Sequence, residues 1–408
     1  MYNSKERRVQ NFRRIEMKGL TIKYLLASIS LFFVFSGCGI NDTKEVNASL
    51  IKSVSKTRCS NKNIKYLFIS MDGLTDPDDV GNITTALVMA KNCEVEILGI
   101  DITGQDIYGK HSTIISAVLY YYGLEQIPIG ESDRTDMRIG DALWVSDYPK
   151  LSSKYLGVAK TIDEFVSDGC SNRLNRANKE CGNRTAAVKM YCDGLNKIPE
   201  GKKANIVVIG HLYNIADLLK ETTYCNGKEL LAKKVEELII SSGWTDMYNH
   251  VPEQNFSSLN KDARKSTASA TLYVFNNLPN NIHVTIVNPA KSKLPKVGDL
   301  YQKYNVNSPM AFAYSVDRYG YGIETGHNIG DALNIIYAIK GLKWYGTQYI
   351  KRKDCNFVIH SNGAVEVRGH TGNHHYIEPN ISDYESFAGR MVSDLMKYEP
   401  KTLKRNNK

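Results

Sequence analysis

The feature that most constrains this chain is an apolar run that leads directly into a cluster of acidic residues. Residues 66–69 (Tyr-Leu-Phe-Ile) are followed by four aspartates within eight residues, Asp72, Asp76, Asp78 and Asp79. A strand that ends in this way places its carboxylates at the carboxyl edge of a sheet, where open α/β folds build their sites. Because adjacent carboxylates repel, a hard cation such as Ca²⁺ or Mg²⁺ between them is one interpretation. A solvated Asp-rich turn is the other.

The rest of the chain alternates short apolar runs with amphipathic segments. This pattern is typical of βα units and predicts an α/β fold with a mostly parallel central sheet and helices on both faces. The predicted strands are 65–70, 95–102, 205–209, 235–241, 283–287 and 365–367. The predicted helices are 82–91, 112–122, 215–220, 261–276, 331–339 and 383–398. The less regular stretch 134–200 is interpreted as an insertion or lid.

Composition narrows the class of protein. A length of 408 residues with 42% hydrophobic content suits one large domain or two ordinary ones. The formal net charge of +9 arises at the two ends of the chain, because residues 1–37 carry seven Lys/Arg and two Asp/Glu and residues 401–408 carry four Lys/Arg and no acid. The body between them is near neutral, which argues against nucleic-acid binding.

The N-terminus is typical of a bacterial lipoprotein signal peptide. Basic residues precede an eleven-residue apolar run, 25–35, which is followed by Ser36-Gly37-Cys38. The run is short for a membrane span but fits the core of a signal peptide. We therefore expect lipidation of Cys38 with acyl chains such as palmitate, and a lipid-anchored protein of the bacterial cell envelope, periplasmic or surface-exposed. Met17 is an alternative start, and an uncleaved anchor is the alternative to cleavage.

The predicted organisation is a signal peptide at 1–37, a tether at 38–62, one folded domain at 63–400 and a basic tail at 401–408. Seven cysteines follow the lipidation site, and none forms a CxxC pair or Cys/His cluster typical of zinc. Export to an oxidising compartment favours disulfides. Cys170 and Cys181, which flank a polar stretch, are the expected pair, and the odd number leaves one thiol over.

Several motifs, in order, resemble those of the inosine-uridine-preferring nucleoside hydrolase family. The loop 72–79 is similar to the family's DxDPGxDD, with Leu74 in place of the second Asp, and Asp76-Pro77 looks like a branch whose loop is DxGxEPDD. Residues 99–106 (GIDITGQD) resemble GITTVxGN, with Asp106 in place of the closing Asn. The later matches are 208–216 (VIGHLYNIA) to AIGPLTNIA, 238–243 to VVMGG, 253–256 (EQNF) to EFN, 260–263 to DPEA, and 330–334 (GDALN) to HDPLA.

The resemblance covers roughly residues 65–398 and implies a calcium-dependent hydrolase of the N-glycosidic bond of ribonucleosides or related ribosides. The implied metal ligands are Asp78, Asp79, Asp331 and the backbone carbonyl of Tyr213. The predicted substrate-binding residues are Asp106, Glu253, Asn255 and His211. The implied partners are a small riboside and the membrane through the lipid anchor alone, and a homo-oligomer is left open.

Two departures from the family leave the chemistry open. Because Leu74 cannot act as the family's water-activating base, Asp72 is the predicted base, with Asp76 second. Gly330 stands where the family has its acid, and His327 is the predicted catalytic substitute. The alternatives are His211, Tyr319, Tyr321, or a leaving group that needs no strong acid. The alternative to an enzyme is a binding protein, a non-catalytic relative that binds a sugar or nucleoside at the cell surface.

Overall fold

The computed structural model describes residues 64–73, 77–106, 110–132, 183–242, 251–258, 263–287, 329–343, 350–369 and 372–379, together with residues 134, 138–139, 313, 386 and 390. These residues lie in one compact unit, Cys59–Lys408. The predicted signal peptide, the tether, the basic tail, the Cys170–Cys181 pair and nearly all of the predicted helix 383–398 lie outside the described residues. Among those described, no helix is long and apolar enough to cross a membrane.

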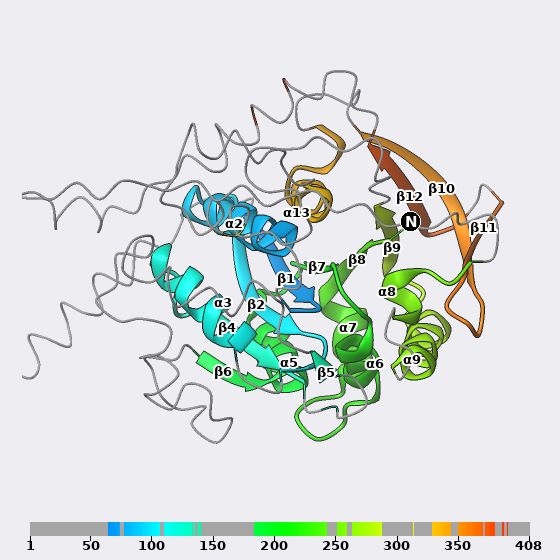
Figure 1. Ribbon diagram of the computed structural model, residues 1–408, viewed down its shortest axis with the longest axis horizontal. Coiled ribbons are helices and arrows are strands. Elements are labelled where there is room, and N and C mark those ends of the chain that lie inside the picture. Colours follow the sequence, from blue (N-terminus) through cyan, green and yellow to red (C-terminus); the bar gives the residue numbers. More distant parts are fainter. Residues whose placement is uncertain are drawn as a thin grey trace, which may run out of the picture. The chain divides into compact units, whose positions relative to one another are not determined.

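A ten-stranded sheet forms the centre of this unit, in the order β11-β10-β12-β9-β8-β7-β1-β2-β4-β6 (Figure 1). Its strands are β1 (Lys65–Met71), β2 (Val95–Ile102), β4 (Pro128–Glu131), β6 (Asn183–Ala186), β7 (Ala204–Val208), β8 (Val235–Ser241), β9 (His283–Val287), β10 (Ile350–Ile359), β11 (Val365–Arg368) and β12 (His374–Pro379). Every neighbouring pair from β6 across to β12 is parallel. Only β10 runs antiparallel, to both β12 and β11. The predicted mostly parallel α/β sheet is confirmed.

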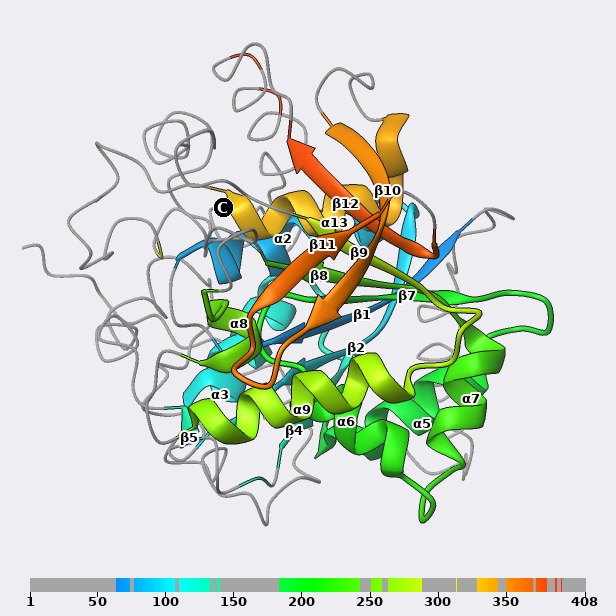
Figure 2. The ribbon, with the colours of Figure 1, turned by 90° about the vertical axis from the view of Figure 1, so that its right-hand side faces the viewer.

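Helices cover both faces of the sheet. They are α2 (Pro77–Lys91), α3 (Lys110–Tyr121), α5 (Ala187–Lys197), α6 (Tyr213–Lys220), α7 (Gly227–Lys234), α8 (Gln254–Ser257), α9 (Arg264–Asn277) and α13 (Gly330–Lys340). Figure 2 shows α2 and α13 on one side of the sheet and α5, α6, α7 and α9 on the other. Because successive strand residues point to opposite faces, Leu67 and Ile69 of β1 pack with α2, α3 and α13, whereas Phe68 packs with α5 and α6. Each such buried side chain contributes roughly 1.5–3 kcal/mol.

The order of the strands creates a switch point at β1. After β1 the chain adds β2 on one side, and later returns to add β7 on the other side of β1. In open α/β sheets a crevice forms outside the carboxyl ends of the strands at such a point. A site is therefore expected at the carboxyl ends of β1, β2, β7 and β8.

Most predicted elements match the structure closely. The predicted bounds of β2, β8 and β9 are those observed. The interpretation of 134–200 as an irregular insertion is wrong for its last part, because β6 pairs with β4 at the sheet edge and α5 packs under the sheet with Met190 and Tyr191 buried. The strand was missed because Asn183–Ala186 is short and polar, and therefore carries no apolar run.

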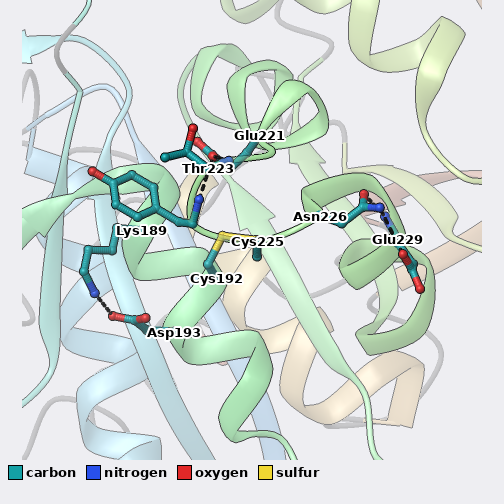
Figure 3. The surroundings of a disulfide bond; sticks show 9 residues. Lys189, Cys192, Asp193, Glu221, Thr223, Cys225, Asn226 and Glu229 are labelled. Atoms are coloured by element: carbon teal, nitrogen blue, oxygen red, sulfur yellow. Dashed lines mark hydrogen bonds and ion pairs between the residues drawn. A yellow bond between two sulfur atoms is a disulfide. The ribbon is translucent and has the colours of Figure 1, made fainter.

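One disulfide within the described part of the chain joins Cys192 of α5 to Cys225, in the loop between α6 and α7 (Figure 3). The same loop is held by Glu221, whose carboxylate accepts from the backbone N of Thr223 and Tyr224. Cys93 is also disulfide-bonded, and Cys355 of β10 is a buried free thiol.

Candidate functional site

The ends of β1 and β7 bring the backbone of Asp72 against Gly210, the residue before His211, at the switch point. The backbone N of Ile209 donates to the carbonyl of Ser70 at 2.8 Å, which extends the pairing beyond the strand. A Cβ atom on Gly210 would lie 2.3 Å from the backbone N of Asp72 and 2.8 Å from its Cβ. Only glycine therefore allows this approach, and it places His211 directly after the contact with Asp72.

His211 is buried, with 4% of its surface exposed. Within the described residues neither ring nitrogen has a hydrogen-bond partner, and the ring stacks near Tyr213 with centroids 6.1 Å apart. Burial lowers the pKa of His211 to about 4, so the imidazole is neutral at pH 7. A neutral imidazole offers one donor and one acceptor, and buried polar atoms left without partners call for an explanation such as a ligand.

Asp331, although distant in sequence, reaches the same edge of the sheet. The hydroxyl of Ser241, the last residue of β8, donates to Asp331 Oδ1 at 2.9 Å. The side chain of Asn82, one turn into α2, donates to the backbone carbonyl of Asp331 at 2.9 Å. Asn255 Nδ2 donates to the carbonyls of Ser241 at 2.7 Å and Ile209 at 3.2 Å. The ends of β7 and β8 and the starts of α2 and α13 are thus tied together.

The three predicted carboxylate ligands occupy the first turns of two helices, α2 and α13, which Asn82 joins by its hydrogen bond to the Asp331 carbonyl. Asp78 and Asp79 occupy the first turn of α2 and Asp331 that of α13, and all three are buried. Their all-oxygen donor set suits Ca²⁺, and helix N-termini favour carboxylates. However, no three or more His, Cys, Asp or Glu side chains in the described ranges are grouped so that they could hold a metal ion. The calcium site stays a prediction.

Tyr213, the first residue of α6, uses its side chain in packing. Its hydroxyl lies 2.6 Å from Ser266 Oγ and 2.7 Å from Thr267 Oγ1, and the guanidinium of Arg134 lies 4.5 Å from its ring centroid. Arg134 is itself paired with Asp217 at 3.0 Å. The role of Tyr213 as a ligand needs only its backbone carbonyl, and it stays a prediction.

Glu253 and Asn255 hold each other in place at the start of α8. Glu253 is the N-cap residue, and its Oε2 accepts from the backbone N of Asn255 at 2.7 Å. Both side chains are buried. The structure therefore gives them a local structural role, and their binding of ribose hydroxyls stays a prediction.

Among the other residues named in the predictions, only Asp106 lies in the described part of the chain. Cys38, Leu74, Asp76, Tyr319, Tyr321 and His327 lie outside the described residues. Asp106 belongs to the two-residue strand β3 (Gln105–Asp106), which pairs with β5 (Arg138–Ile139). The backbone of Asp106 therefore follows the carboxyl end of β2, at the edge of the sheet where the site was predicted.

Sequence reasoning missed His111, in the first turn of α3. This side chain is buried. It lies beside the Asp-rich loop, since a Cβ on Gly73 would be 2.9 Å from His111 Nδ1. Gly73 has φ +100°, a conformation that favours glycine. No sequence signal distinguishes a single histidine on an amphipathic helix from a core residue.

Sequence reasoning also missed Asp101, near the end of β2. The carboxylate is fully buried and accepts from Ser70 Oγ at 3.0 Å, from the hydroxyl of Tyr191 and from Asn214 Nδ2. Burial raises the pKa of Asp101 to about 6, while the three hydrogen bonds oppose this rise. An Asp inside an otherwise apolar strand, where the resembled motif has Thr, was the available signal.

Solved structures of nucleoside hydrolases share this architecture. An inosine-uridine preferring nucleoside hydrolase from Bacillus anthracis superposes with a TM-score of 0.55 at 16% sequence identity, covering 82% of this chain and 99% of that chain. An inosine-guanosine nucleoside hydrolase gives a TM-score of 0.55 at 14% identity, with coverage of 82% and 99%. The type III effector protein XopQ, complexed with adenosine diphosphate ribose, gives 0.52 at 14%, with coverage of 86% and 98%.

No protein-family model matches the sequence, and no curated protein matches it either. At these identities the structural likeness shows the fold. The chain has the nucleoside hydrolase fold, which confirms the fold that the order of motifs predicts.

Proposed function

We propose that this protein hydrolyses the N-glycosidic bond of ribonucleosides or related ribosides at the carboxyl edge of its sheet. The observation that carries the proposal is the convergence of buried polar groups from β1, β7, β8, α2 and α13 at the switch point. The nucleoside hydrolases of the same fold support the reaction class. The adenosine diphosphate ribose bound to XopQ supports a ribosyl ligand.

The chemistry needs a carboxylate that accepts a proton from the attacking water. Hydrolysis of a glycosidic bond passes through an oxocarbenium-like transition state, so a nearby negative charge also stabilises it. Asp72 has the place for both tasks, at the end of β1 and against Gly210. In this proposal the neutral ring of His211 hydrogen-bonds the bound riboside.

Calcium belongs to the same proposal. Asp78, Asp79, Asp331 and the carbonyl of Tyr213 would hold it, and a bound cation of this kind orients the substrate and acidifies water. One carboxylate oxygen of Asp331 already accepts a hydrogen bond from Ser241. Sensitivity of the protein to a chelator is therefore a direct test of this part.

Help for the leaving group is expected to be weak. Gly330 offers no acid, and His211 is neutral at pH 7 because burial lowers its pKa to about 4. Substrates whose departing group needs no proton should consequently react best. A second function, non-catalytic binding of a sugar or nucleoside, is favoured by Gly330 and Leu74, which stand where the resembled family has its acid and its water-activating base.

The test is a panel of ribonucleosides and p-nitrophenyl riboside incubated with purified protein, with and without chelator, and with Asp72→Asn as the matched inactive variant. Release of ribose that both the chelator and the variant abolish supports the hydrolase. Ligand binding by calorimetry without ribose release supports the binding protein. If the protein neither binds any of these ligands nor releases ribose, both proposals are overturned.

We further propose that Cys38 carries a lipid anchor that holds the protein in the bacterial cell envelope. The sequence motif alone supports this proposal. A Cys38→Ser variant should move from the membrane fraction to the soluble fraction, and mass spectrometry of the wild-type N-terminal peptide should show the acyl chains.

A further inference from the structure

The end of β2 holds the turn that carries His211. The backbone N of His211 donates to Thr103 Oγ1 at 3.4 Å, and Asn214 Nδ2 donates both to the carbonyl of Ile102 at 3.0 Å and to the carboxylate of Asp101. These contacts connect the turn between β7 and α6 to three consecutive residues at the end of β2, the strand on the far side of β1. Asp101 supplies the one charged group among them.

Asp101 is an unusual group to place in the middle of a sheet. It is fully buried, and its three hydrogen-bond donors, Ser70, Tyr191 and Asn214, are all neutral. No cation within the described ranges contacts it. A buried carboxylate without a cation is costly unless hydrogen bonds compensate, and costly charges tend to mark functional sites.

The elements packed around Asp101 carry few other titratable groups near it. Tyr191 of α5 makes direct contact, and Glu131 follows Gly130 of β4, where a Cβ would lie 3.0 Å from Asp101 Cβ. On β1, Asp72 lies two residues beyond Ser70, and on α6, Asp217 is paired with Arg134. Tyrosine stays neutral in the range of interest because burial raises the pKa of Tyr191 well above its usual value.

We propose that Asp101 is a positioning residue of the candidate site, whose carboxylate holds Asn214, and through it the His211 turn, and whose protonation loosens that hold. The proposal concerns the free protein and does not depend on hydrolysis. It adds to the site a group that acts through Asn214 without touching the ligand.

The chemistry of the partners explains why protonation loosens the hold without breaking it. The proton goes to Oδ2, because the hydroxyl of Tyr191 can rotate to accept it, whereas the amide nitrogen of Asn214 cannot accept. Oδ1 then remains an acceptor, but a neutral one. Hydrogen bonds to a charged acceptor are roughly twice as strong as those to a neutral one. The protection of the turn against hydrogen exchange should therefore fall by on the order of tenfold.

Asp101→Asn is the decisive variant, because asparagine has the shape of the protonated acid and keeps one oxygen for Asn214. The measurement is NMR of the side-chain amide of Asn214 and of the backbone amide of His211 between pH 4.5 and 8. In the wild type these signals should titrate with a midpoint near the pKa of Asp101, about 6. In Asp101→Asn the titration near pH 6 should be absent, and the Asn214 signal should resemble that of the wild type at pH 4.5 throughout the range.

Two further variants separate positioning from mere packing. Tyr191→Phe removes only the donor to Oδ2, so the midpoint of the titration should move to higher pH. At pH values above that midpoint the turn should stay in place. Glu237→Gln is the matched control, because this acid bonds Thr285 and Tyr337 at the other end of β8 and should change nothing.

A wild type whose Asn214 and His211 signals do not titrate near pH 6 would overturn the proposal. So would a titration that persists in Asp101→Asn. If Asp101→Asn does not fold, the upward shift in Tyr191→Phe carries the test, and an unchanged midpoint there would reject the proposal.

Discussion

Ser241, the last residue of β8, donates a hydrogen bond to Asp331 in the first turn of α13, 90 positions further along the chain. The contact fixes one carboxylate oxygen of Asp331 at the carboxyl edge of the sheet. In addition, the side chain of Asn82 donates to the backbone carbonyl of Asp331, so the start of α13 lies against α2, the helix that begins with Asp78 and Asp79.

Replacing Asp331 with Asn should weaken calcium binding, because the change removes a charged oxygen ligand. Calorimetric titration with Ca²⁺ measures the effect. Ser241→Ala is the matched comparison, since it keeps the ligand and removes only its support, an effect typically worth about 10–100-fold in metal affinity. Asp331→Asn should exceed that loss, and unchanged Ca²⁺ binding in this variant would show that the metal-site assignment is wrong.

Asp101→Asn should change the dependence of stability on pH. Burial raises the pKa of Asp101 from its ordinary value of 3.8 to about 6, so the folded state holds this proton more tightly than the unfolded state. The resulting stability is full below pH 3.8 and is lost as the pH rises through 6. The asparagine variant has no such loss. Between pH 4 and pH 7 its free energy of unfolding should therefore rise relative to that of the wild type, by on the order of 3 kcal/mol.

Urea denaturation at several pH values measures this gain. Glu237→Gln controls for the loss of a carboxylate elsewhere in the sheet. A difference between wild type and Asp101→Asn that stays constant from pH 4 to pH 7 would contradict the prediction.

Gly210→Ala should disturb the site directly. The added Cβ would lie 2.3 Å from the backbone N of Asp72, and backbone cannot yield as the end of a flexible side chain can. We expect a loss of about 1–3 kcal/mol in the free energy of unfolding, together with weaker riboside binding. Gly201→Ala is the control, since nothing lies within 4 Å of a Cβ there and any loss comes from its φ of +73°. Equal riboside binding by both variants would rule out the proposed approach of Asp72 and His211.

The choice of substrate should reveal the missing acid. If the protein hydrolyses ribosides, p-nitrophenyl riboside should be preferred to inosine, because a positioned acid typically contributes on the order of 10²–10⁴-fold to the departure of a poor leaving group. Steady-state rates with both substrates give the ratio. His327→Ala then identifies a substitute acid if only inosine hydrolysis falls. Equal turnover of the two substrates by a variant without His327 and His211 would refute the idea that leaving-group help is limiting.

Local sequence patterns predicted six of the ten strands of the sheet, β1, β2, β7, β8, β9 and β11, because these are short, rich in β-branched residues and bounded by polar residues. β2, β8 and β9 were predicted at their observed bounds for this reason. The start of α2 was missed because Pro77, Asp78 and Asp79 resemble a loop, although proline followed by acidic residues is also typical of a first helical turn. β6 was missed because its place at the sheet edge is set by β4 and not by its own sequence.

The candidate site was predictable only where a motif carried it. The place of Asp331 followed from the order of motifs in the resembled family. The environment of Asp101 did not, because its donors Ser70, Tyr191 and Asn214 lie 31, 90 and 113 residues away in sequence. No local pattern encodes an encounter between residues on four separate elements.

Tyr191, which reaches Asp101, is followed directly on α5 by Cys192, which is bonded to Cys225 (Figure 3). A covalent bond to a loop between α6 and α7 therefore restrains the helix turn that supports a buried acid in the sheet. Reduction of that bond would remove this restraint, which we expect to change how readily Asp101 takes up a proton. The same polypeptide matured in a reducing and in an oxidising compartment should then differ in its response to mild acid.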